Sequence, residues 1–265
     1  MRKLSMILYR CCWVAFLALL VAGYYLDFSW LWGWLPLGLA FALQLAANRQ
    51  PAVADARPVV EVDPPVTGRW SALNSPADRV PSHGTRGYGQ AYAIDIVAEP
   101  EDTARPRFGW WPFVRGNRHF PAFGTPILAV ADATVLSAVD HHRDHLSRNS
   151  YPALLYLLVE SILRDLSGPG RVFGNHVILD LGDGTYAAYA HLRRDSLTVR
   201  AGDRVHSGHL LARCGNSGNT TEPHLHFQLM DDPDLDVARG VPFTWRGIGV
   251  PGNGEVFTVA QTANT

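Results

Sequence analysis

Residues 174–192 read GNHVILDLGDGTYAAYAHL, and this stretch indicates the class of fold. Two short runs of β-branched, aromatic and small apolar residues, 176–181 and 186–190, flank the tripeptide Gly-Asp-Gly. Asp-Gly sequences tolerate the left-handed backbone of a tight turn, so the stretch predicts a β-hairpin.

Similar runs lie on both sides of this hairpin. Each is short and bounded by Gly, Pro, Asn or Asp, as strands are; the runs cover residues 91–97, 126–130, 134–139, 197–200, 210–213 and 224–230. Many short strands with frequent turns favour an antiparallel β roll or sandwich. We therefore expect a mainly β domain.

Two segments interrupt this rhythm. Residues 99–122 show no periodicity and predict a long loop that carries Trp110 and Trp111. Within a second insertion near 141–173, the segment 151–166 (YPALLYLLVESILRDL) has apolar residues at helical spacing, with Pro near its start and Gly after its end. We expect an inserted amphipathic helix whose leucines pack on the sheet, in preference to lying on a membrane.

Apolar residues concentrate near the N-terminus. No charged residue occurs in 11–26 or in 28–47, and Asp27 separates the two runs. A transmembrane helix needs about 20 apolar residues. Residues 1–47 are therefore predicted to be a membrane anchor of one or two transmembrane helices, preferably a hairpin that turns at Asp27. A cleaved signal peptide and a buried pair of soluble helices are the alternatives.

The rest of the chain divides into a linker and a folded domain. Residues 48–65 (NRQPAVADARPVVEVDPP) combine Pro and Ala with scattered charge, which is typical of an extended linker. Residues 66–265 form the expected domain. The chain has a net charge of -1, whereas nucleic-acid-binding proteins usually carry an excess of basic residues. We therefore expect no nucleic-acid partner. Nothing in the sequence identifies a protein partner.

Histidines and one aspartate are candidates for a metal site. His224 and His226 lie on one face of an alternating segment, because residues i and i+2 of a strand point the same way. Asp95 lies between two isoleucines, and a buried carboxylate needs a cation or several hydrogen-bond donors. Catalytic zinc sites use three protein ligands and leave one position for water. His83, Asp95 and His226 provide such a set.

Two histidines would then remain beside the bound water. His191 ends the second strand of the hairpin, and His224 precedes the ligand His226 by two residues. A general base, or a donor to a developing oxyanion, is what peptide hydrolysis needs there.

The order of these motifs resembles the M23 family of zinc metallopeptidases, of the lysostaphin and LytM type. The resemblance covers residues 82–229, with the motifs Asp95, FGTPI (123–127), AHL (190–192), GDRVHSG (202–208) and PHLHF (223–227). It implies an antiparallel β roll that binds one zinc ion and hydrolyses peptide bonds of bacterial cell-wall peptidoglycan. It also implies that Asp95 and His226 are zinc ligands and that His191 and His224 are the catalytic histidines.

One position departs from the family pattern. The family commonly has its first ligand four residues before the aspartate, where this chain has Ala91. His83 lies further upstream, and we expect the glycines at 84, 87 and 89 to let the chain fold back so that His83 is the third ligand. The rival hypothesis is a weak or inactive LytM-like domain that binds or activates other cell-wall hydrolases.

The sequence thus predicts a membrane-anchored zinc metalloendopeptidase whose substrate is peptidoglycan cross-links or stem peptides. A biotinyl or lipoyl carrier domain, suggested by VRAGDRVHSGHLLA (199–212), is excluded because such domains attach their cofactor to a lysine and the only lysine is Lys3.

Two features of the sequence disagree about the side of the membrane on which the domain lies. Basic residues at 2, 3 and 10 favour a cytoplasmic N-terminus, to which a hairpin would return the chain. Because a cell-wall enzyme must face outward, we expect an extracytoplasmic domain at the bacterial cell membrane.

Overall fold

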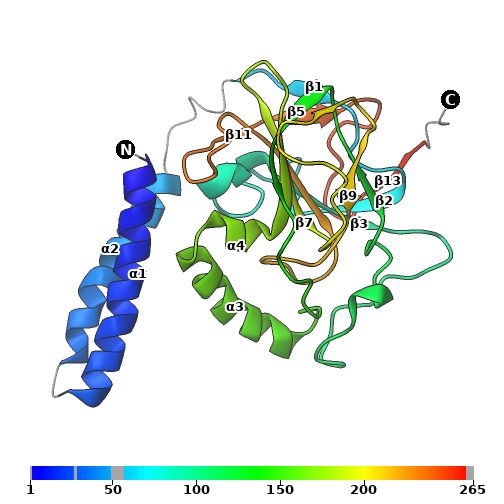
Figure 1. Ribbon diagram of the computed structural model, residues 1–265. Helices are drawn as coiled ribbons and strands as arrows, with labels where there is room; N and C mark the ends of the chain where they lie inside the picture. Colours follow the sequence, from blue (N-terminus) through cyan, green and yellow to red (C-terminus); the bar gives the residue numbers. More distant parts are fainter. Residues whose placement is uncertain (1, 27–28, 49–56, 261–265) are drawn as a thin grey trace.

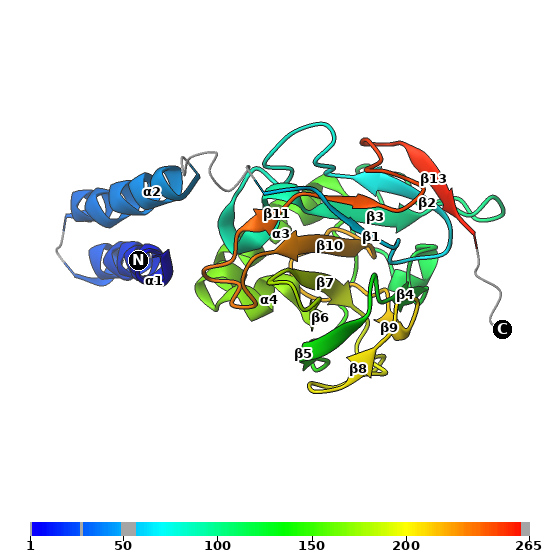
Figure 2. The ribbon, with the colours of Figure 1, turned by 90° about the horizontal axis from the view of Figure 1, so that it is seen from above.

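A computed structural model describes residues 2–26, 29–48 and 57–260 (Figure 1). The N-terminal part is a helical hairpin that extends beside the β domain (Figures 1 and 2). It consists of α1 (Arg2–Tyr25), the short 3-10 helix η1 (Trp30–Gly33) and α2 (Trp34–Asn48). The expected turn residue, Asp27, lies outside the described residues.

The two helices of the hairpin pack on each other. The rings of Trp13 and Phe41 meet edge to face with centroids 6.3 Å apart. Residues Lys3–Tyr25 are long and apolar enough to cross a membrane by length and composition, and Trp30–Ala46 is a shorter apolar helix. The helical hairpin of the sequence prediction is therefore present, whereas its insertion in a membrane stays a prediction.

The domain is built on one large antiparallel sheet. Its strand order is β13-β2-β3-β10-β7-β6-β5-β8, and β11 pairs with β10. Two small two-stranded sheets join β1 to β12 and β4 to β9. This confirms the mainly antiparallel β class expected from the sequence. The strands are β1 (Val60–Val62), β2 (Gly68–Leu73), β3 (Ile94–Ala98), β4 (Pro126–Leu128), β5 (Ala133–Val139), β6 (Asn175–Asp180), β7 (Tyr186–Leu192), β8 (Arg204–Val205), β9 (Leu210–Arg213), β10 (Leu225–Met230), β11 (Gly240–Val241), β12 (Phe243–Trp245) and β13 (Val256–Val259).

Two local expectations differ from the structure. β1 lies within residues 48–65, the expected linker, and pairs in parallel with β12, so folded structure begins before residue 66. Residues 197–200 are not a regular strand, although Thr198 N donates to Leu211 O at 2.9 Å. The division into anchor, linker and domain otherwise stays a prediction.

Alternation along the central strands separates the core from the candidate site. Ile94 and Ile96 of β3 and Leu225 and Phe227 of β10 belong to the main hydrophobic core. The residues between them, Asp95 and His226, point to the opposite face because strand side chains alternate. A smaller apolar cluster, which includes Tyr88 and Phe173, packs on that opposite face.

The remaining elements are helical and lie mostly in the insertions. They are η2 (Gly87–Tyr92), η3 (Asn117–His119), α3 (Tyr151–Leu166) and α4 (Pro169–Phe173). α3 has the bounds that the sequence predicted, and Ser150 caps its first turn by accepting a hydrogen bond from Ala153 N. Contrary to expectation, three of its leucines, Leu155, Leu158 and Leu163, are exposed to solvent. Of the helix only Ala153 and Leu157 are buried, while Leu155 is 68% exposed.

Candidate metal centre

Strand register brings two of the candidate ligands together. β3 and β10 are antiparallel neighbours, and Asp95 lies directly opposite His226. His226 Nδ1 is 2.9 Å from Asp95 Oδ1. Both side chains are buried, so the pairing of two strands far apart in sequence places two metal-binding groups in contact.

The loop before η2 brings His83 to the same point. Gly84 and Gly89 have φ values of 71° and 76°, a left-handed backbone that glycine adopts without strain. Ser82 anchors the loop, since its backbone N–H donates to Ala91 O at 3.0 Å and its hydroxyl donates to Ala93 O at 2.6 Å. His83 Nε2 then lies 3.0 Å from Asp95 Oδ2. The structure thus brings together the three residues predicted as ligands.

The arrangement of the three side chains suits a metal ion. One ligand atom from each of His83, Asp95 and His226 lies within 4.8 Å of the others. Ligand atoms of a tetrahedral zinc ion, at about 2.0–2.1 Å from the metal, are roughly 3.3 Å apart. The two contacts to Asp95, at 2.9 and 3.0 Å, are close to that separation.

Hydrogen bonds behind the histidines set which ring nitrogen carries a proton. The Ser82 hydroxyl uses its hydrogen on Ala93 O, so His83 Nδ1, 3.0 Å away, must donate to the Ser82 oxygen. Gln228 Nε2 donates to Tyr88 O at 2.8 Å, so its Oε1 faces His226 Nε2 at 3.0 Å and accepts from it. Each ring therefore presents its other nitrogen, with a free electron pair, to Asp95.

The lone pairs of His83 Nε2 and His226 Nδ1 face the negatively charged oxygens of Asp95, so a positive charge is needed between them. Without a metal, each would require an extra proton to satisfy Asp95. Burial opposes this and lowers the pKa of His226, although the hydrogen bond to Asp95 acts the other way. A single divalent cation would take the place of both protons. Histidines that bind a metal through one ring nitrogen usually donate the N–H of the other ring nitrogen to a neighbouring acceptor, as His83 and His226 do here. The donor set therefore fits a metal ion.

Asp95 is held as a carboxylate. Burial by itself would raise its pKa, but the positive charge of His83 and His224, when those rings are protonated, holds the pKa of Asp95 well below its usual range. Asn74 Nδ2 also donates to Asp95 Oδ2 at 2.9 Å. Sequence reasoning missed Asn74, which carries no spacing signal. It also missed Gln228, which could have been found because it shares the strand face of His224 and His226.

The two remaining histidines lie beside this group. The His191 and His224 rings are 4.8 Å apart, and His224 Nε2 is 3.5 Å from Asp95 Oδ1. Each Nδ1 faces a carbonyl at 2.8 Å, Ser217 O for His191 and Glu222 O for His224. A carbonyl only accepts, so each Nδ1 carries the proton and each Nε2 of the neutral ring is able to accept one.

Burial and backbone geometry both constrain His191. Burial, together with the nearby His224 and His226, holds the pKa of His191 well below its usual value, so the ring is neutral. For His224 burial acts in the same direction, but the charge of Asp95 outweighs it and the pKa is raised. His191 also has a φ of 61° at the end of β7, an unusual backbone for a residue with a side chain.

Parts of the chain are similar to known proteins. Residues 164–237, which include His191, His224 and His226, match the model of Peptidase family M23. A glycyl-glycine endopeptidase, ALE-1 of Staphylococcus capitis, is 28% identical over 132 residues, which are 46% of this chain and 28% of that protein. Peptidoglycan DD-endopeptidase ShyA of Vibrio cholerae is 31% identical over 78 residues, 29% of this chain and 16% of that protein. The chain thus spans less than a third of these relatives.

Among solved structures, a glycyl-glycine endopeptidase LytM described as putative, from Ruminococcus gnavus, matches with 18% identity and a TM-score of 0.39, covering 77% of this chain and 68% of that one. The catalytic domain of lysostaphin from Staphylococcus simulans matches with 21% identity and a TM-score of 0.30, covering 51% of this chain and 85% of that one. The family-model match over residues 164–237 and the assembled His83, Asp95 and His226 together make this chain similar to the peptidases of family M23.

Proposed function

We propose that the chain is a zinc metalloendopeptidase that hydrolyses peptide bonds in peptidoglycan cross-links or stem peptides. The observation that carries the proposal is the group of His83, Asp95 and His226, with two further histidines, His191 and His224, whose Nδ1 atoms are each oriented by a backbone carbonyl. The two relatives named as endopeptidases support this class of substrate. The rival hypothesis of a degenerate site rested on Ala91, and the contact of His83 with Asp95 argues against it.

His83, Asp95 and His226 would hold the zinc ion, which when bound supplies a Lewis acid for the scissile carbonyl and acidifies a water molecule. His191 is the candidate general base, because burial keeps it neutral and the Ser217 carbonyl turns its Nε2 outward. His224, fixed in the same way by the Glu222 carbonyl, is the candidate donor to the developing oxyanion once it is protonated.

The N-terminal hairpin is proposed as the membrane anchor. The first turns of α1 contact the domain, since Arg10 Nη2 is 2.6 Å from Asp236 Oδ1 and Arg10 Nε donates to Asp165 O at 3.1 Å. The uncharged remainder of α1 and all of α2 are left to enter the bilayer. Since α2 runs back toward the domain (Figure 1), both ends of the hairpin lie on the domain side. The proposed substrate requires that side to be extracytoplasmic.

The test is hydrolysis of purified peptidoglycan by the full chain in detergent, measured as new amino termini. We expect zinc-dependent release by the wild type and a loss of at least about a hundredfold in His191→Ala, the usual effect of removing a general base. His206→Ala is the matched control, because the His206 side chain is 87% exposed and contacts Asp132, outside the group. No zinc-dependent release by the wild type, or full activity of His191→Ala, would contradict the proposal.

A further inference from the structure

Helix α3 turns its apolar side away from the protein. Leu155, Leu158 and Leu163 are 68%, 57% and 55% exposed, and Tyr156 and Val159 are exposed as well. A helix on the surface of a soluble domain normally does the opposite, with its apolar stripe toward the core and its polar face toward water. The orientation of α3 therefore needs a separate explanation.

The charged residues of α3 face inward and are paired there. Glu160 binds Arg148 at 2.9 Å and Arg164 at 3.2 Å, with all three side chains at most 18% exposed. Asp165 Oδ1 accepts a hydrogen bond from the Tyr88 hydroxyl. The inverted orientation is thus fixed by specific ion pairs and hydrogen bonds to the domain.

The exposed apolar surface continues from α3 into the long loop of the first insertion. Tyr151 N donates to Gly109 O at 3.0 Å, and the Tyr151 ring contacts Phe108 and Trp110 with centroids 4.8 and 4.7 Å away. Trp110 and Trp111 are 70% and 74% exposed, and Phe113 is also exposed. Helix and loop therefore present one continuous apolar surface.

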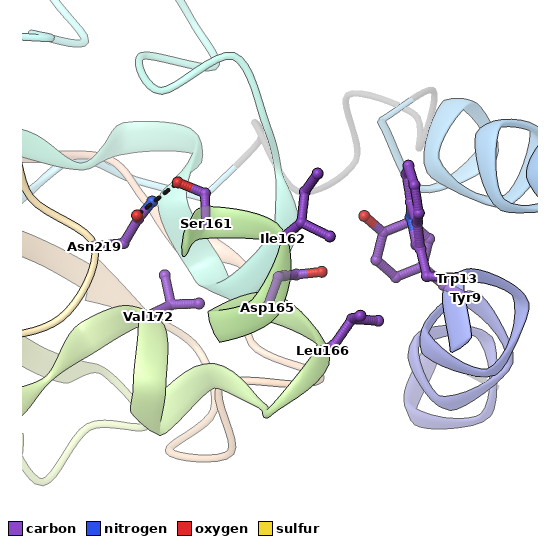
Figure 3. Close-up of a pocket in the computed structure, with 8 residues that line it drawn as sticks. All are labelled: Tyr9, Trp13, Ser161, Ile162, Asp165, Leu166, Val172 and Asn219. Atoms are coloured by element: carbon purple, nitrogen blue, oxygen red, sulfur yellow. Dashed lines mark hydrogen bonds between the residues drawn. The ribbon is translucent and has the colours of Figure 1, made fainter. Parts of the chain in front are cut away.

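At its other end α3 meets the candidate membrane helix. Tyr9 and Trp13 of α1 line a cavity together with Ile162 and Leu166 of α3 (Figure 3). In Figure 1, α3 runs along the lower edge of the domain, and the hairpin projects downward beside it. The apolar surface therefore adjoins the hairpin and lies at the edge of the domain toward which the hairpin projects.

We propose that this surface rests on the lipid bilayer, so that the domain binds the membrane at a second place beside its anchor. The lipid-facing patch consists of Leu155, Leu158 and Leu163 of α3 and Trp110, Trp111 and Phe113 of the loop. Leucines suit the outer acyl region, and Trp and Tyr are favoured at the membrane interface. The inference rests on the proposed membrane anchor and is independent of the proposed peptidase activity.

A bilayer fits this patch better than a protein partner does. The six residues of the patch carry no charge that would select a partner, and α1, which packs beside α3, has an uncharged remainder that is proposed to enter the bilayer. An inserted hairpin keeps lipid next to the patch at all times, which gives even a weak contact a high effective concentration. Lipid contact would also hold the domain in one orientation on the membrane.

The experiment measures the surroundings of α3 in the full chain, reconstituted in phosphatidylcholine–phosphatidylglycerol vesicles. Cys11 and Cys12 are replaced by alanine; Cys214 is fully buried and stays. An environment-sensitive fluorophore is then attached to Leu158→Cys or, as a second variant on the same side, Leu155→Cys. Arg200→Cys, at a side chain 90% exposed, is the matched aqueous control, and Leu39→Cys in α2 reports insertion of the anchor. Thermal unfolding followed by circular dichroism checks that each variant is folded.

We expect the probes at 158 and 155 to be quenched by spin-labelled lipid several-fold more than the probe at 200, and to be protected from aqueous iodide. Iodide quenching equal to that at residue 200 would overturn the inference. Protection from both quenchers would overturn it too, because it would mean that a protein surface, such as a second copy of the chain, covers α3. If the anchor does not insert, the probe at residue 39 will show no quenching by spin-labelled lipid. The probes at 158 and 155 alone test whether the patch contacts lipid.

Discussion

Replacement of Gln228 tests how the structure prepares His226 to bind a metal. Gln228 is fully buried, donates to Tyr88 O at 2.8 Å and accepts from His226 Nε2 at 3.0 Å. Gln228→Met keeps the length of the side chain but removes the acceptor. His226 Nε2 then loses its partner, and the tautomer that presents Nδ1 beside Asp95 is no longer favoured.

The size of the effect follows from this one lost contact. Loss of an outer-shell hydrogen bond to a metal ligand typically lowers metal affinity by about 10–100-fold, which corresponds to about 1.4–2.7 kcal/mol of binding free energy. We expect Gln228→Met to bind zinc within this range below the wild type, and to recover activity when zinc is supplied in excess.

The assay is competition for zinc with a fluorescent chelator at neutral pH. Met230, the next residue on the same strand face and also buried, provides the control Met230→Leu, for which we expect an unchanged affinity. A zinc affinity of Gln228→Met within twofold of the wild type, in a protein with unchanged circular dichroism, would refute the reasoning about the tautomer of His226.

Three further outcomes are expected. Ser82→Ala removes the acceptor of His83 Nδ1, so the same chelator assay should show a loss of about tenfold in zinc affinity; an unchanged affinity would count against His83 as an oriented ligand. Glu160→Gln leaves the largely buried Arg148 without its carboxylate. At a cost of about 2–3 kcal/mol, the Tm should fall by about 4–12 °C. Glu61→Gln, from the exposed pair with Arg246, should change the Tm by less than about 2 °C, and equal shifts in the two variants would contradict the inward pairing of α3. Because burial holds the pKa of His191 well below its ordinary value of 6.5, this base stays neutral as the pH falls through that value. The acid limb of kcat/KM should therefore lie below pH 6.5, and a limb at or above pH 6.5 that persists in His224→Ala would count against His191 as the base.

Features of the fold that depend on residues close together in the sequence were predicted from local sequence patterns. Alternation along 224–230 placed His224 and His226 on one face, and the isoleucines around Asp95 indicated a buried strand. The bounds of α3 followed from its periodicity, from Pro152 near its start and from Gly168 after its end. These features depend on residues a few positions apart, which a single sequence displays.

Features set by distant contacts were harder to predict. Helical periodicity defines an apolar stripe but not the direction it faces, and the pairing of Glu160 with Arg148 turned the stripe of α3 outward. Asn74 reaches Asp95 only because β2 pairs with β3. β1 gains a partner, β12, that lies far along the chain, so its composition alone indicated a linker.

The zinc content of the purified full chain and of its His83→Ala variant is the most direct test of the metal centre. His83 replaces the ligand expected at Ala91, and its Nε2 lies 3.0 Å from Asp95 Oδ2. We predict about one zinc ion per chain in the wild type and in the control His206→Ala, and loss of most of the zinc in His83→Ala. Equal zinc content in His83→Ala and the wild type would contradict the assignment of His83, and absence of zinc from the wild type would contradict the metal centre as a whole.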